Sequence, residues 1–158
     1  MPPASNPLRL QIIDRIVAIL SAITTGSDYF FTPGKVAKRF MYAEEIDAYP
    51  CYMVTAGEKG GAVDSVGLPN YYDENFTISI RGVIKDDADT VTKCEQALAD
   101  VRKAINADSI PGAPVGSLHE LAILTWFTEG PDMDEGFLSL QGYGYFNQRV
   151  TVRINETF

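Results

Sequence analysis

The most regular pattern of apolar and polar positions lies between residues 73 and 108. It begins with an alternation whose apolar members are Phe76, Ile78 and Ile80, which is the pattern of a strand with one buried face. After Lys85 the apolar residues recur every three or four positions, at Val91, Cys94, Leu98, Val101 and Ile105. This spacing predicts an amphipathic helix. We expect Asp86 or Asp87 to cap it, with Asp89 in its first turn.

A second helix is predicted from Pro7 to Ile23. Asn6 precedes Pro7 as a cap residue before a proline that favours the first helical position. The stretch from Tyr49 to Ala56 predicts a strand, and Pro50 belongs at its start because proline cannot donate a ladder hydrogen bond. Its two faces carry Tyr52 with Val54 and Cys51 with Met53.

Two further strands are predicted in the last third of the chain. Residues 121–127 are apolar on both faces, which favours a central strand covered on both sides. From residue 138 to 154 the apolar positions keep one period-two register, and at ~3.3 Å per residue an unbroken strand of that length spans roughly 55 Å. We therefore expect a bend at Gly142 to Gly144, or a strand end that projects from the domain. The missing side chains there should let a helix or another chain approach closely.

Together these elements predict one α/β (α+β) domain over residues 1–158. The predicted sheet is mostly antiparallel, with about four or five strands and two main helices packed on one face. Residues 1–6 are predicted to be a flexible tail.

Residues 57–72 are glycine-rich and polar, and they predict a long loop. Such a loop is expected to be mobile in the monomer and to become ordered on assembly, because its glycines raise the entropy cost of ordering. Its apolar members are candidate interface residues: Val63, Val66, Leu68, Tyr71 and Tyr72.

A dense basic cluster is formed by Lys35, Lys38 and Arg39. It is either a solvated strand edge or an electrostatic contact with an acidic neighbouring protein. Arg149 and Arg153, on the polar face of the closing strand, complete the candidate interface.

The formal net charge is −8 and the sequence pI about 4.5. Such a chain repels phosphates, so a nucleic-acid-reading module is not expected. No apolar run reaches the ~18 residues of a membrane helix, and no secretory signal is evident. Cys51 and Cys94 are read as buried thiols in a reducing cytoplasm, although a disulfide is the alternative.

The sequence offers little catalytic chemistry. His119 is the single histidine, and Cys94 on the apolar helix stripe is poorly placed as a nucleophile. Asp132, Asp134 and Gly136 match part of a calcium loop, but the later ligands are missing. No phosphate loop or dinucleotide fingerprint occurs. We therefore predict no enzyme activity, no cofactor and no metal.

The order of elements resembles the tail terminator, or tail completion, proteins of long-tailed bacteriophages. The features that carry this resemblance are the buried first helix, the strand that begins at Tyr49-Pro50-Cys51, the helix that begins Asp-Asp-Ala-Asp and the closing strand. The resemblance implies a homo-hexameric ring at the head-proximal end of the tail in the virion. It also implies a tail tube protein and a head–tail connector or neck protein as partners, with DNA passing through the ring without specific binding.

The sequence is also compatible with two functions other than that of a tail terminator. The chain is either another morphogenesis component, such as a connector or a tail tube subunit, or a small enzyme or ligand-binding domain. The second alternative requires a pocket lined by Tyr71, Tyr72, Tyr143 and Tyr145.

Overall fold

The computed structural model describes residues 6–65, 71–86, 88–108, 118, 121, 124–127 and 142–157, with the backbone alone for 57–65, 71–72, 124–126 and 156–157. The elements follow one another in the order α1 (Leu8–Ser21), β1 (Lys35–Ala37), the 3₁₀ turn η1 (Ala43–Glu45), β2 (Cys51–Ser65), β3 (Tyr71–Lys85), α2 (Thr90–Ala107), β4 (Leu124–Phe127) and β5 (Tyr143–Thr157).

The strands form a five-stranded sheet in the order β1-β2-β3-β5-β4. β1 pairs with β2 in parallel, and the other three pairings are antiparallel, so the predicted mostly antiparallel sheet is confirmed. Among the strands that the structure describes, β4 is the last in the order and pairs only with β5, so the central position predicted for residues 121–127 is not seen in this part of the chain. Apolar residues on both faces indicate burial, but they do not say how many neighbouring strands there are.

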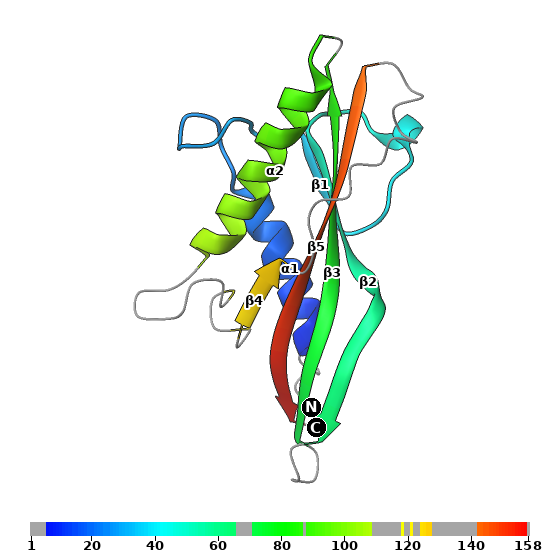
Figure 1. The fold of residues 1–158 in the computed structure, drawn as a ribbon, viewed down its shortest axis with the longest axis vertical. Helices are drawn as coiled ribbons and strands as arrows, with labels where there is room; N and C mark the ends of the chain where they lie inside the picture. Colours follow the sequence, from blue (N-terminus) through cyan, green and yellow to red (C-terminus); the bar gives the residue numbers. More distant parts are fainter. Residues whose placement is uncertain are drawn as a thin grey trace.

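Both α-helices pack on one face of the sheet, as predicted (Figure 1). The main core lies between the two helices and the sheet. Its fully buried members include Ile12, Ile16, Leu20, Val54, Ile78, Ile80, Val101, Phe146, Val150 and Val152. Each such side chain contributes about 1.5–3 kcal/mol through its removal from water. The period-two positions of β3 and β5 therefore face the helices. The polar alternates lie on the opposite face, which carries neither of the two described α-helices and which we call the helix-free face.

A smaller second core lies on the helix-free face. Its buried members are Met41, Ile46, Cys51, Met53 and Val83. As predicted, Tyr52 and Val54 of β2 face the main core, while Cys51 and Met53 face this second one. The chain between β1 and β2 therefore returns across the sheet on the side opposite the helices, where Figure 1 shows η1.

The helix ends differ by a few residues from the predicted ones. Pro7 is the N-cap of α1 and Leu8 its first helical residue. Asp89 caps α2 by accepting a hydrogen bond from the Thr92 N–H at 3.0 Å, so the assignment of the cap to Asp86 or Asp87 is wrong. Val91 is 72% exposed, because this first-turn position does not belong to the buried stripe.

The prediction of a long loop at residues 57–72 is wrong for most of that range. Residues 57–65 continue β2, and β3 begins at Tyr71. Register shifts between Ala56 and Gly60 and between Gly60 and Val63 mark bulges that accommodate the extra residues while the strands stay paired. Glycine lowers strand propensity, but pairing along a long neighbour outweighs that cost here. Val66 and Leu68 lie outside the described residues, and the predicted ordering on assembly stays a prediction.

The predicted close approach at the last glycines is confirmed at Gly144. Strand β5 begins at Tyr143, directly after Gly142, whose φ is +84°. A Cβ on Gly144 would overlap the Cys94 sulfur and lie 3.3 Å from the Thr90 carbonyl oxygen. The glycine therefore lets the first half of α2 lie directly on β5.

Replacement of Gly144 by alanine should lower the free energy of unfolding by about 1–3 kcal/mol, the usual cost of overpacking. The control is Cys94→Ala, which removes the overlapping sulfur. In urea denaturation the double variant should lose less stability than the sum of the two single variants. Additive losses would contradict the contact.

Candidate functional site

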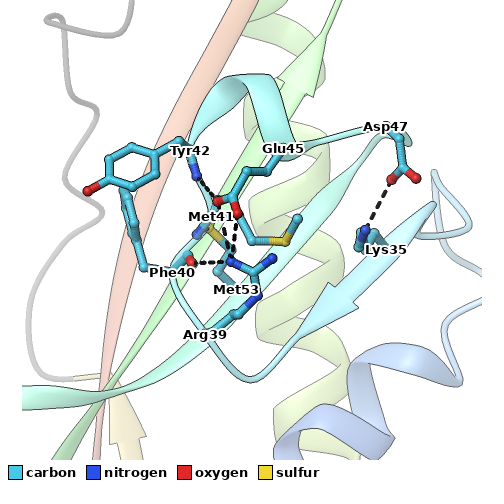
Figure 2. Close-up of polar contacts among 8 residues, drawn as sticks. All are labelled: Lys35, Arg39, Phe40, Met41, Tyr42, Glu45, Asp47 and Met53. Atoms are coloured by element: carbon cyan, nitrogen blue, oxygen red, sulfur yellow. Dashed lines mark hydrogen bonds and ion pairs between the residues drawn. The ribbon is translucent and has the colours of Figure 1, made fainter.

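The most distinctive surface lies on residues 38–47, which we call the covering segment because it covers the second core. Met41 is 1% exposed, and its N–H lies 3.1 Å from the Met53 sulfur (Figure 2). Because the backbone is extended at the next residue, the burial of Met41 directs its two neighbours outwards. Those neighbours are Phe40 and Tyr42.

Phe40 and Tyr42 form an exposed aromatic pair. They are 42% and 64% exposed, and their rings meet edge to face with centroids 5.3 Å apart. The Arg81 guanidinium of β3 lies 5.7 Å from the centre of the Phe40 ring. Large aromatic side chains held at the surface are typical of protein–protein contacts.

The covering segment is fixed by a polar clamp around Glu45 (Figure 2). The Glu45 carboxylate accepts the Tyr42 N–H at 2.8 Å and the Arg39 guanidinium at 3.0 Å. Arg39 also donates to the Phe40 carbonyl oxygen at 3.2 Å. The hydrogen bond from the Tyr42 backbone, followed by that from Arg39, lowers the pKa of Glu45. Because this folded-state pKa is lowered, the clamp stabilises the fold above the ordinary pKa of glutamate and is lost as the pH falls through the lowered value.

The predicted basic cluster carries little uncompensated charge. Lys35 pairs with Asp47 at 3.2 Å and Lys38 with Asp14 at 2.6 Å, and Arg39 pairs with Glu45. Lys35 lies on the edge strand β1, so the interpretation as a solvated strand edge accounts for it. Within this surface the exposed aromatic pair is more distinctive than the charge.

Charge reversal separates the roles of Lys38 and Arg39. Arg39→Glu places two carboxylates together at the clamp and should loosen Tyr42, whereas Lys38→Glu removes only an exposed ion pair with Asp14. Both variants should unfold close to the wild-type urea concentration. In sedimentation at low salt, Arg39→Glu should weaken self-association more than Lys38→Glu does. Equal behaviour of the two variants would contradict the clamp.

The remaining candidate interface residues lie elsewhere. Val63, Tyr71 and Tyr72 are in the distal hairpin of β2 and β3, opposite Glu74, Thr157 and Glu156. Val63 lies 12 positions along β2 from Cys51, the partner of Lys35, which at ~3.3 Å per residue is roughly 40 Å. The candidates therefore form two separate surfaces.

The two arginines of β5 lie along the sheet between these two surfaces. Arg149 is opposite Ser79 in the centre of the sheet. Arg153 is opposite Asn75 and forms an ion pair with Asp73. That contact lowers the pKa of Asp73.

The hypothesis of a pocket lined by four tyrosines is wrong. Tyr71 begins β3, whereas Tyr143 pairs with Lys85 at the other end of that strand. Tyr143 and Tyr145 instead pack against the second core, and the Tyr143 ring meets Tyr49 edge to face at 5.9 Å.

Residues 29–31, which we call the aromatic loop, lie against α2 on the helix side of the sheet. The sequence patterns did not predict this contact. Asp100 of α2 is 1% exposed, and its carboxylate accepts the Phe30 and Phe31 N–H groups at 3.0 Å. Lys103 lies 5.2 Å from the centre of the Tyr29 ring. These contacts hold Phe30 at the surface, where it is 54% exposed.

The described residues carry little sign of catalytic chemistry. Cys51 and Cys94 are both free and buried, as predicted. Burial raises the pKa of both thiols, that of Cys94 to about 11, so neither is a ready nucleophile at neutral pH. His119, Asp132 and Asp134 lie outside the described residues.

The described part of the chain contains no cluster of three or more metal-binding side chains. None of the helices in that part is long and apolar enough to cross a membrane.

Comparison with known proteins gives a likeness of fold. No protein-family model matches the chain, and no curated protein matches it. Among solved structures, a chain from the virion of a native gene transfer agent particle superposes with a TM-score of 0.58 and 13% sequence identity. The alignment covers 96% of this chain and 99% of that chain. The two chains therefore share one fold over nearly their whole lengths.

Proposed function

We propose that this protein is a structural component of a virion, and specifically a tail terminator. In this proposal it forms a homo-hexameric ring at the head-proximal end of the tail tube. The ring stops tube polymerisation and offers its other side to the head–tail connector. The observation that carries the proposal is the fold shared end to end with a chain of a gene transfer agent virion.

The surface chemistry supports assembly over catalysis. Among the described residues, exposed aromatic side chains occur on both sides of the sheet, with Phe30 on the helix side and the Phe40–Tyr42 pair on the other. A ring of identical subunits needs two different complementary surfaces, since each subunit contacts two neighbours. The formal charge of −8 also suits a channel through which DNA passes without being held.

A tail tube subunit or a connector is the second candidate, because such proteins assemble through similar surfaces. A terminator, a tube subunit and a connector differ in where assembly stops. A tube subunit stacks into long polymers by itself, whereas a terminator stops at one ring. A connector binds heads and leaves tube length unchanged.

The proposal is tested with tail tube protein from a virus that encodes this chain. Tube subunits should polymerise to shorter lengths when the purified chain is added, and the virus lacking it should make overlong tails without heads. Tails of normal length joined to heads in its absence would contradict the proposal.

A further inference from the structure

The helix side of the molecule carries a hollow of about 240 Å³ between the C-terminal halves of α1 and α2. Its wall is built mainly from small and apolar side chains, among them Ala18, Ala22, Ile23, Ala104 and Ala107. Ala18, Ala22 and Ala107 are exposed, so the hollow opens to solvent, while Ile23 is buried. Tyr29 of the aromatic loop closes one side.

An ion pair borders the hollow. The Arg15 guanidinium donates two hydrogen bonds to the Asp108 carboxylate, with 3.0 Å between Nε and Oδ2. Asp108 is the C-cap residue of α2, and Arg15 belongs to α1, so the ion pair joins the two helices beside the hollow. The result is an apolar recess with one polar, hydrogen-bonding border.

The Phe40–Tyr42 pair has the chemistry that such a recess accepts. It projects from the helix-free face, is apolar over its rings and carries one hydroxyl group at the Tyr42 end. The sheet separates this pair from the hollow, as the positions of η1 and the helices in Figure 1 show. A subunit therefore cannot fill its own hollow, but an adjacent copy in head-to-tail orientation can.

We propose that the hollow between α1 and α2 receives the Phe40–Tyr42 pair of a second copy of this chain. The rings then pack on the alanines, and the Tyr42 hydroxyl meets the Arg15–Asp108 pair. This inference deepens the proposed function, because it names the surfaces by which neighbouring subunits of the ring join.

Two observations favour a side chain of another copy over a small molecule. The hollow is smaller than the about 300–1,000 Å³ typical of small-molecule sites. Both partners are also held rigidly before contact, the pair by the Glu45 clamp and Tyr29 by the loop that Asp100 anchors. Such preorganisation reduces the entropy lost on binding.

Cysteine cross-linking of the full chain tests the contact. Tyr42→Cys and Ala22→Cys proteins, mixed and treated with a short bismaleimide, should give cross-linked dimers. The control partner is Ala99→Cys, an exposed position on α2 that does not line the hollow. The native Cys51 and Cys94 are buried and should react slowly. A protein that carries both new cysteines should give a ladder that ends at the size of the closed ring.

Substitutions supply a second readout. Ala22→Trp, which fills the hollow, and Tyr42→Ser should each weaken self-association at least about tenfold, the scale of a central interface residue. The matched controls are Ala99→Trp and Val91→Ser, which alter exposed positions elsewhere and should leave self-association unchanged. Circular dichroism should show all four variants folded.

The outcomes separate this inference from the proposed function. Rings that form without the 42–22 cross-link, or a Tyr42→Cys protein that cross-links only with itself, would overturn the contact and leave the tail terminator proposal standing. Cross-linked rings that do not shorten tail tubes would support the contact and overturn the terminator role. A chain that stays monomeric at high concentration would overturn both.

Discussion

Replacement of Asp100 by alanine should lower the free energy of unfolding by about 2–4 kcal/mol. The carboxylate is 1% exposed and accepts the Phe30 and Phe31 N–H groups. Hydrogen bonds to charged groups contribute about 1.5–3 kcal/mol each, and part of this is regained when the loop opens to water. Urea denaturation measures the loss.

Asp100→Asn is the matched control, because it keeps the shape and one acceptor oxygen and should lose less stability than Asp100→Ala. The alanine variant should also weaken self-association, since Tyr29 lines the hollow and would lose its anchor. An alanine variant as stable as the wild type would show that the loop is not held by this carboxylate.

Replacement of Met41 by alanine should cost about 2–5 kcal/mol, the range for truncating a buried methionine. Met41 is 1% exposed and holds the covering segment on the second core. Met41→Leu nearly conserves the volume and should cost less than about 1.5 kcal/mol.

The Met41 variants also connect the second core to assembly. In thermal unfolding and sedimentation, Met41→Ala should lose both stability and self-association, because Phe40 and Tyr42 are positioned by their buried neighbour. Retained self-association in a destabilised Met41→Ala protein would separate the aromatic pair from the second core.

The periodic stretches of the sequence predicted the framework well. The alternation at Phe76, Ile78 and Ile80 predicted the helix-facing side of β3, and Val150, Val152 and Ile154 did the same for β5. Burial of one face leaves a local signature in the chain, so it can be read without knowledge of the neighbours.

Features that depend on distant partners left no such signature. Strand formation at residues 57–65 relies on pairing with β3 in spite of the glycines. The burial of Asp100 depends on backbone groups about 70 positions earlier in the chain. The place of β4 beside β5, last in the order of the described strands, depends on pairing with a distant part of the chain.

The candidate site was harder to predict than the fold. The cluster of Lys35, Lys38 and Arg39 stands out in the sequence, but its acidic partners come from two other places in the chain, at Asp14 and at residues 45–47. Phe40 and Tyr42 look like core residues by composition, and only the burial of Met41 between them turns them outwards. Residues 40–42 are apolar or aromatic throughout, so the sequence holds no alternation that would show which side chain is buried.

Electron microscopy of the purified full chain, alone and with tail tubes, tests the central claim most directly. The account predicts single closed rings of six subunits that do not stack by themselves and that cap one end of each tube. Long stacked polymers, or a chain that stays monomeric and leaves both tube ends bare, would contradict it.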